Sequence, residues 1–294
     1  MYSNNAMEIR RQAHGKGKLE TVTCISNDYG FAVCSLIVLG QKEAVVVDTQ
    51  WTRANAYRVV AEIIESGRDL KAVIISHAHP DHYFGAEVYH QAFPNAIIYA
   101  MPEDIPVIEK EMQGKKDYWQ DEAGMNKHNI PQTDGVPLTP LEGESVYIEG
   151  QEIHIYKKCW GDLKYNTMTW IPSISTLYGS DILFSNAHPF TCEVSAKGRA
   201  KWKKELDRFE AFNAEVVIPG HAKWGEPFDG RAFEFTRSYI DATEEELAKT
   251  NDIATFYYNM MIRFPDALLL RSDEMNSNVF KGTREWYFSD DGDD

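Results

Sequence analysis

Short apolar runs alternate with segments of helical spacing through the first hundred residues. The β-branched and apolar runs Phe31–Val38 and Glu43–Val47 are separated by a glycine-containing break and predict a β-hairpin. Thr52–Ser66 follows with apolar residues at helical spacing and predicts a helix, which Gly67 ends. The same reasoning predicts two further strands and one more helix, at Ala72–Ile75, Ala96–Tyr99 and Tyr83–Ala92.

Residues 103–143 break this alternation. They hold clustered Lys and Asp with several Gly and Pro, and only Ile105–Met112 is predicted as a helix. A connection of this length inside a compact domain is typical of a lid or binding loop. Helical patterning returns from Phe228 onward and predicts an extension packed on the core. Between these regions we predict strands at Ser145–Ile148, Glu152–Tyr156, Met168–Ile171, Thr176–Phe184 and Glu215–Ile218, and a helix at Ala200–Phe212.

The strongest chemical signal follows the predicted strand Ala72–Ile75, where His77, His79, Asp81 and His82 occur within six residues. Three protonated imidazoles this close would repel one another, whereas a divalent metal takes neutral imidazole and ionised carboxylate as ligands. His77 and His79 project to one side of an extended segment, and the other two residues lie beyond a turn. One strand end is therefore predicted to supply ligands to two neighbouring metals. A chance cluster on a surface loop is the alternative, which the density of histidines disfavours.

The pattern H-x-H-x-D-H after a hydrophobic strand resembles the metallo-β-lactamase fold superfamily, and further motifs appear in order from about Thr21 to Trp224. Asp48, at the end of Val45–Val47, is similar to the carboxylate that braces the metal-binding loop in that family. Asp181 resembles the aspartate that bridges two metals, and His221 resembles the histidine that binds the second metal.

The resemblance implies an α/β protein with a four-layer αββα sandwich and a helical C-terminal extension. We expect a metallohydrolase domain over residues 1–226, with 103–143 as a lid-like insertion. Residues 227–285 would then form the helical extension. Residues 286–294 are predicted to be a disordered acidic tail, because four of the last five are Asp.

One motif departs from the family pattern, because Asp162 stands where a histidine usually supplies the third ligand of the first metal. Asp162 lies nineteen residues before Asp181, which is the expected spacing. Carboxylate oxygen is an acceptable zinc ligand, and the sulfatase-like branch of the superfamily resembles this in using an acid. A carboxylate shifts the metal preference towards harder ions such as Mn²⁺ or Fe²⁺. The alternative is that Asp162 marks a lost metal site. His154, eight residues earlier, is a rival candidate for the third ligand, but a structural role is expected for it.

Four other residues are candidates for lining a substrate pocket. His188 follows the predicted Asp181 strand, and Lys223 closely follows His221. Trp51 stands three residues after Asp48, and Trp160 stands two residues before Asp162, so both indoles are candidates for an apolar wall. Packing or solvent exposure is the alternative for each of the four.

Composition restricts the partners. The chain has 294 residues with 30 Lys and Arg against 45 Asp and Glu, a net charge of −15. Without a basic stripe it lacks the surface that binds a nucleic-acid backbone, so a small-molecule substrate is expected. No apolar signal segment or membrane span is evident, and the four cysteines show no close pairing. These features predict a cytoplasmic protein without a membrane or nucleic-acid partner, and they leave the oligomeric state open.

The resemblance implies a metal-dependent hydrolase with two divalent ions, zinc first and Mn²⁺ or Fe²⁺ as alternatives. A metal-bound hydroxide would attack a small-molecule ester, lactone, thioester or amide, with Asp81 and Asp181 as the catalytic carboxylates. Alternatives are a phosphodiesterase or sulfatase-like hydrolase, which Asp162 favours, and a mononuclear or iron redox protein. The expected ligands are His77, His79 and Asp162 for the first metal, Asp81, His82 and His221 for the second, and Asp181 between them.

Overall fold

The computed structural model describes residues 7–15, 19–122 and 124–282. These residues fall into two compact units, the first within Met1–Ile155 and Trp170–Ile174 and the second within Tyr156–Thr169 and Ser175–Asp294. The expected acidic tail, 286–294, lies outside the described residues. The boundary expected at residue 226 stays a prediction.

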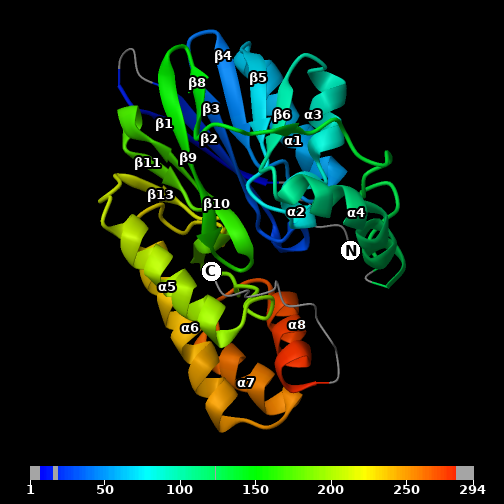
Figure 1. The fold of residues 1–294 in the computed structure, drawn as a ribbon, viewed down its shortest axis with the longest axis vertical. Coiled ribbons are helices and arrows are strands. Elements are labelled where there is room, and N and C mark those ends of the chain that lie inside the picture. Colours follow the sequence, from blue (N-terminus) through cyan, green and yellow to red (C-terminus); the bar gives the residue numbers. More distant parts are fainter. Residues whose placement is uncertain (1–6, 16–18, 123, 283–294) are drawn as a thin grey trace. The chain divides into compact units, whose positions relative to one another are not determined.

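A seven-stranded sheet organises the first unit (Figure 1), in the order β1-β2-β3-β4-β5-β6-β7. Pairing is antiparallel from β1 to β4 and parallel from β4 to β7. The change to parallel pairing places the carboxyl ends of β4, β5 and β6 at one edge, where loops commonly carry function. The strands are β1 (Met7–Ala13), β2 (Glu20–Ser26), β3 (Cys34–Leu39), β4 (Glu43–Val47), β5 (Asp69–Ile74), β6 (Ile97–Ala100) and β7 (Thr139–Pro140).

Helices pack on this sheet through one apolar core. Helix α1 (Arg53–Ser66) begins at Thr52, whose side chain accepts from the Asn55 N–H, and ends at Gly67 in the left-handed conformation. Its buried apolar residues share a core with those of α3 (Ala86–Ala92) and with the sheet. The shorter α2 (Pro80–Tyr83) begins with proline at its first position.

The segment 103–143 contains more regular structure than the sequence predicts. Helix α4 spans Asp104–Asp117 and continues into a π-helical turn, Tyr118–Glu122. The predicted helix is therefore correct in place but too short. Apolar side chains of the segment belong to the core of the first unit: Ile108, Met112, Trp119, Met125 and Ile130.

Two antiparallel strand segments also lie in the first unit. β8 (Ser145–Ile148) pairs with the first half of β9 (Gln151–Trp160), so that Ser145 lies opposite His154. Short 3₁₀ turns at Asp28–Gly30 and Pro172–Ile174 also belong to this unit.

The second unit has its own strands, in the order β13-β11-β10-β9 for the parts that belong to it. They include β10 (Lys164–Ile171), β11 (Thr176–Tyr178) and β13 (Val216–Ile218), with β11 and β13 parallel. A separate parallel pair joins β12 (Phe184–Ser185) to β14 (His221–Ala222). The predicted single strand Thr176–Phe184 is wrong, because a 3₁₀ turn at Ser180–Ile182 interrupts it.

Four helices accompany these strands: α5 (Ala196–Glu210), α6 (Arg231–Lys249), α7 (Ile253–Arg263) and α8 (Leu270–Lys281). Consecutive helices pack against one another, and α6 and α7 share a small apolar core around Tyr239 and Phe256. Thr236 in α6 receives a hydrogen bond from the N–H of Phe184 at 2.9 Å, which fixes α6 against β12. The predicted C-terminal helices are therefore confirmed, as is the α/β class.

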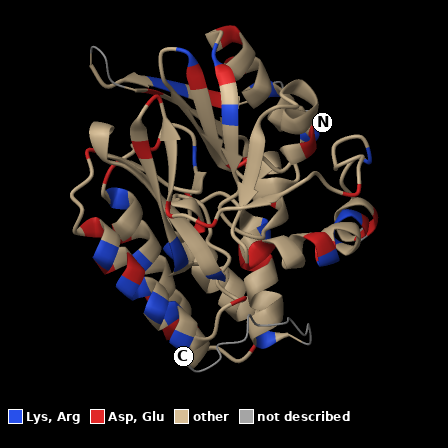
Figure 2. Cartoon of the chain, turned by 45° about the horizontal axis from the view of Figure 1, so that its top comes forward, with Lys and Arg blue, Asp and Glu red and all other residues tan. Residues whose placement is uncertain are grey.

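Figure 2 shows Lys and Arg interspersed with Asp and Glu along helix α5. All four cysteines are buried and outside disulfides. In the described part of the chain, no helix combines the length and apolarity needed to cross a bilayer.

Candidate metal centre

In the first unit, the histidine motif is organised around the buried carboxylate of Asp48. This residue directly follows β4 with a positive φ of 63°, and its Oδ1 atom accepts from the N–H of Ser76 at 2.9 Å. Its Oδ2 atom accepts from the Ser76 hydroxyl and from Nδ1 of His82, both at 2.8 Å. These hydrogen bonds join Asp48 to the loop, and its role as a brace for metal ligands stays a prediction. Ser76 is a second bracing residue, which sequence reasoning missed.

These bonds determine which nitrogen of each ring carries the proton. The Ser76 hydroxyl donates its only hydrogen to Asp48, so its oxygen accepts from Nδ1 of His77 at 2.9 Å. His82 donates from Nδ1 to Asp48 in the same way. In both rings Nε2 is then the unprotonated nitrogen, which is the form that binds a metal.

The other motif residues lie close to these two rings. The His77 ring centroid is 4.8 Å from that of His79 and 4.2 Å from that of His82. Asp81 Oδ2 lies 3.6 Å from Nε2 of His82. His77 and His82 are fully buried and His79 is 8% exposed.

Close backbone packing holds this loop against the neighbouring strand end. The Thr49 N–H and hydroxyl both donate to the carbonyl of His82 at 2.9 Å. Gly85 follows α2, and a Cβ atom there would lie 1.9 Å from the Thr49 carbonyl oxygen. Only glycine fits at this position without a shift of the backbone.

Asp104 is a buried carboxyl group near the motif that sequence reasoning missed. It begins α4 and is 3% exposed. Burial raises its pKa to about 8 with a contribution from Glu103, while the imidazole of His79 acts in the opposite direction. The pairing of β5 with β6 brings the beginning of α4 to the edge of the sheet that carries this loop, and a sequence pattern does not reveal such pairing.

The second unit brings two predicted acidic ligands together. One carboxylate oxygen of Asp162 and one of Asp181 lie within 4.8 Å of each other, and both residues are almost fully buried. The Asp162 N–H donates to the Asp181 carbonyl at 3.2 Å. The Asn166 amide donates to Oδ1 of Asp162 at 2.9 Å, which fixes the orientation of that carboxylate.

His221 lies beside the same pair of acids. Its Nε2 atom is 3.0 Å from Oδ2 of Asp181, and its ring stacks on Phe184 with centroids 5.1 Å apart. The preceding Gly220 allows this approach, because a Cβ atom there would lie 2.3 Å from Oδ1 of Asp181. The structure thus brings together the three ligands that the sequence predicts for this unit.

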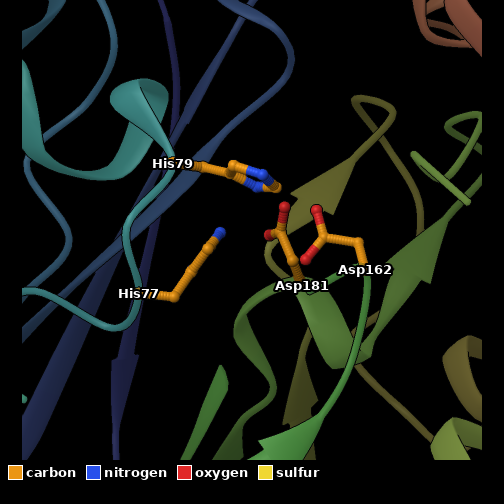
Figure 3. Close-up of side chains that lie close together, drawn as sticks. All are labelled: His77, His79, Asp162 and Asp181. Carbon is orange, nitrogen blue, oxygen red and sulfur yellow. The ribbon is translucent and has the colours of Figure 1, made fainter. Parts of the chain in front are cut away.

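The side chains in Figure 3 come from two kinds of turn. His77 and His79 lie on the loop after β5, whereas Asp162 and Asp181 lie on turns between strands of the second unit. Imidazole nitrogen with carboxylate oxygen is a donor set that suits zinc, manganese or iron. The residues present therefore fit a divalent transition metal, and the assignment of each ligand stays a prediction.

Two other candidates take part in contacts with their own unit. His154 lies beside Ser145 and Glu152, with its Nδ1 atom 3.3 Å and 3.4 Å from their side-chain oxygens, in agreement with the structural role expected for it. Lys223 donates from Nζ to the backbone carbonyl of Asp266 at 2.7 Å.

His188 is fully buried in a polar cluster of the second unit. Its Nδ1 atom is 3.0 Å from the Tyr239 hydroxyl, which donates to Asp273 at 3.4 Å. Burial lowers the pKa of His188 to about 4 and raises that of Asp273 to about 8. Asn276 completes the cluster by accepting the N–H groups of residues 191 and 192.

The two tryptophans of interest pack against neighbouring side chains. Trp51 is 5% exposed and lies edge-on to Phe31 and Trp119, with ring centroids 4.1 Å and 4.7 Å away. The Lys201 ammonium lies 4.3 Å from the Trp160 ring centroid, a cation–π contact. A contact of either indole with substrate stays a prediction.

Comparisons with known proteins agree with this arrangement. The family model of the metallo-beta-lactamase superfamily matches residues 27–221. The fold is similar to solved structures of TMB-1 and of the metallo-beta-lactamase IND-7, each 18% identical with a TM-score of 0.55. These matches cover 82% and 80% of this chain and 99% and 98% of the other. A metallo-beta-lactamase from Pontibacter korlensis, also 18% identical, has a TM-score of 0.52 over 80% of this chain and 99% of its own. No match was found among curated proteins.

Proposed function

We propose that this chain, which belongs to the metallo-β-lactamase superfamily, hydrolyses a small-molecule ester, lactone, thioester or amide with the help of divalent metals. The observation that carries the proposal is the family match over 27–221, which contains every predicted ligand from His77 to His221 in order. We expect two adjacent metal ions, and zinc is the metal that we favour.

The ligand assignment follows the order of the motifs. His77, His79 and Asp162 would hold one metal, and Asp81, His82 and His221 would hold the other, with Asp181 shared. When bound, divalent metals polarise a carbonyl oxygen and lower the pKa of bound water to about 7. This supplies the nucleophile, so that no serine or cysteine nucleophile is needed.

Other residues of the site orient the metal-binding histidines or transfer protons. Asp48 fixes the protonated nitrogen of His82 and, through Ser76, that of His77. Asp81 would accept the proton of the attacking water and pass it to the leaving oxygen, sulfur or nitrogen as the bond to the carbonyl carbon breaks. The hydroxyl of the water is then on the carbonyl carbon and its proton is on the leaving group.

A phosphodiester or sulfate ester is the second candidate substrate. Asp162 favours it, because this buried carboxylate stands where the family usually has histidine and is oriented by Asn166. A panel of chromogenic ester, lactone, thioester, phosphodiester and sulfate ester substrates separates the two candidates. Turnover of only the phosphodiester or the sulfate ester would favour the second.

Metal content and two variants test the proposal. We expect at least one equivalent of transition metal in the purified protein and hydrolysis that stops with chelation and returns with metal. Asp181→Ala should abolish hydrolysis, whereas His90→Ala, on α3, should retain it because His90 is not among the predicted ligands. Less than about half an equivalent of metal with no chelator sensitivity, or equal activities of the two variants, would overturn the proposal.

A further inference from the structure

Metal-binding histidines depend on the group that holds their second ring nitrogen. Such a partner fixes the tautomer and the orientation of the ring and raises its basicity. In this chain, Asp48 provides that support for His82 directly and for His77 through the Ser76 hydroxyl. The third imidazole of the motif is that of His79, at the beginning of α2.

The sheet brings Asp104 to this side of the loop. β5 and β6 are parallel neighbours, with Ile74 opposite Tyr99. His79 and Asp104 each stand five residues beyond that pair, after the carboxyl ends of the two strands. Both residues therefore follow the carboxyl ends of adjacent parallel strands, which lie at the same edge of the sheet.

The surroundings of Asp104 require a partner for its carboxyl group. The residue is 3% exposed, and its Oδ2 atom is buried without a hydrogen bond from the described residues. Burial of a carboxyl group without a partner is costly. The helix that Asp104 begins also contacts the motif loop, because Nζ of Lys115 on α4 donates to the carbonyl of Ala78, the residue before His79, at 3.3 Å.

We propose that Asp104 is a positioning residue for His79, whose carboxyl group orients this imidazole and strengthens it as a metal ligand. The inference rests on the proposed function, because it assigns His79 to the first metal. It parallels the role of Asp48 towards His82, but the carboxylate comes from the next strand of the sheet. The motif would then be supported by carboxylates on both sides, from β4 and from β6.

A zinc-affinity measurement tests this role without any substrate. Competition with a chromophoric chelator gives the affinity of the full chain for zinc. Asp104→Ala should weaken the affinity by about 10-fold to 100-fold, the usual effect of losing such a partner. The isosteric Asp104→Asn should lie between Ala and the wild type. Glu109→Gln, an exposed acid on the same helix, is the matched control and should change the affinity less than about twofold.

A double-mutant cycle separates positioning from a general structural role. If Asp104 acts through His79, Asp104→Ala should have less than about a twofold effect on zinc affinity in a His79→Ala background. An equal loss in both backgrounds would overturn the inference. The metal-free Asp104→Asn protein should unfold at the same temperature as the wild type or higher, and a clear drop would indicate a structural role instead.

The outcome for the wild type distinguishes this inference from the proposed function. A wild-type protein that binds no zinc refutes the proposed function itself. A wild type that binds zinc tightly, together with Asp104→Ala that binds it equally well, refutes only the role of Asp104.

Discussion

The buried cluster around Tyr239 gives a quantitative prediction for stability against pH. Asp273 is fully buried, and its pKa is raised by burial from the usual 3.8 to about 8. An acid with a raised pKa in the folded state stabilises the fold below its unfolded value, and that contribution falls as the pH rises towards 8. Asp273→Asn keeps the shape of the side chain and removes this titration.

The size of the effect follows from the pKa values. Between pH 6.5 and 8.5 the wild type should lose about 2 kcal/mol of unfolding free energy through Asp273, at about 1.4 kcal/mol for each pH unit up to its folded pKa. His188 has the opposite sign, because its pKa is lowered to about 4 and its contribution is complete above pH 6.5. It therefore does not affect this window.

Urea unfolding at several pH values measures the prediction. The unfolding free energy of Asp273→Asn minus that of the wild type should increase by about 2 kcal/mol between pH 6.5 and 8.5, because all other titrations cancel in the difference. Glu274→Gln, an exposed neighbour on α8, should give a flat difference. A flat profile for Asp273→Asn as well would show that Asp273 is already ionised in the fold and would refute the reasoning.

Two further changes test the loop that carries the histidine motif. Both carboxylate oxygens of Asp48 accept hydrogen bonds, and Asp48→Asn replaces one of these oxygens with an amino group. Zinc affinity, measured by chelator competition, should therefore fall about 10-fold to 100-fold. An unchanged affinity would contradict the bracing role. Gly85→Ala should lower the unfolding free energy by about 1–3 kcal/mol in urea, because its Cβ would meet the Thr49 carbonyl oxygen. Gly114→Ala, on α4 with open space around it, is the control and should be neutral or stabilising. Equal effects of both alanines would argue against the close contact.

Local patterns in the sequence predicted the elements that carry the histidine motif. The hairpin, the helix after it and the buried strand before His77 all occur near their predicted positions, because each is a contiguous apolar pattern. The family and the class of metal-dependent hydrolase were also predicted correctly, because the motifs are short and ordered. The finer assignments of metal, substrate and individual ligands stay predictions.

Features that depend on pairing or on a single turn were harder to predict. The strand expected over Thr176–Phe184 is broken at Asp181, since an apolar run looks the same whether or not a 3₁₀ turn interrupts it. Strand β1, Met7–Ala13, was not predicted, because it is a half-exposed edge strand with several polar and charged residues. The position of Asp104 near the histidine motif depends on the pairing of β5 with β6, which the sequence does not reveal.

Gly220 carries no chemical group, yet it restricts how this sequence can diverge. Any side chain there would occupy space that an oxygen of Asp181 fills, so the acid and the adjacent His221 would have to move together. A duplicated copy of this chain with a larger residue at that position should therefore lose the function of both predicted ligands while still containing both residues in its sequence. For such copies, a glycine before the last histidine is a more sensitive marker of a working centre than the histidine alone.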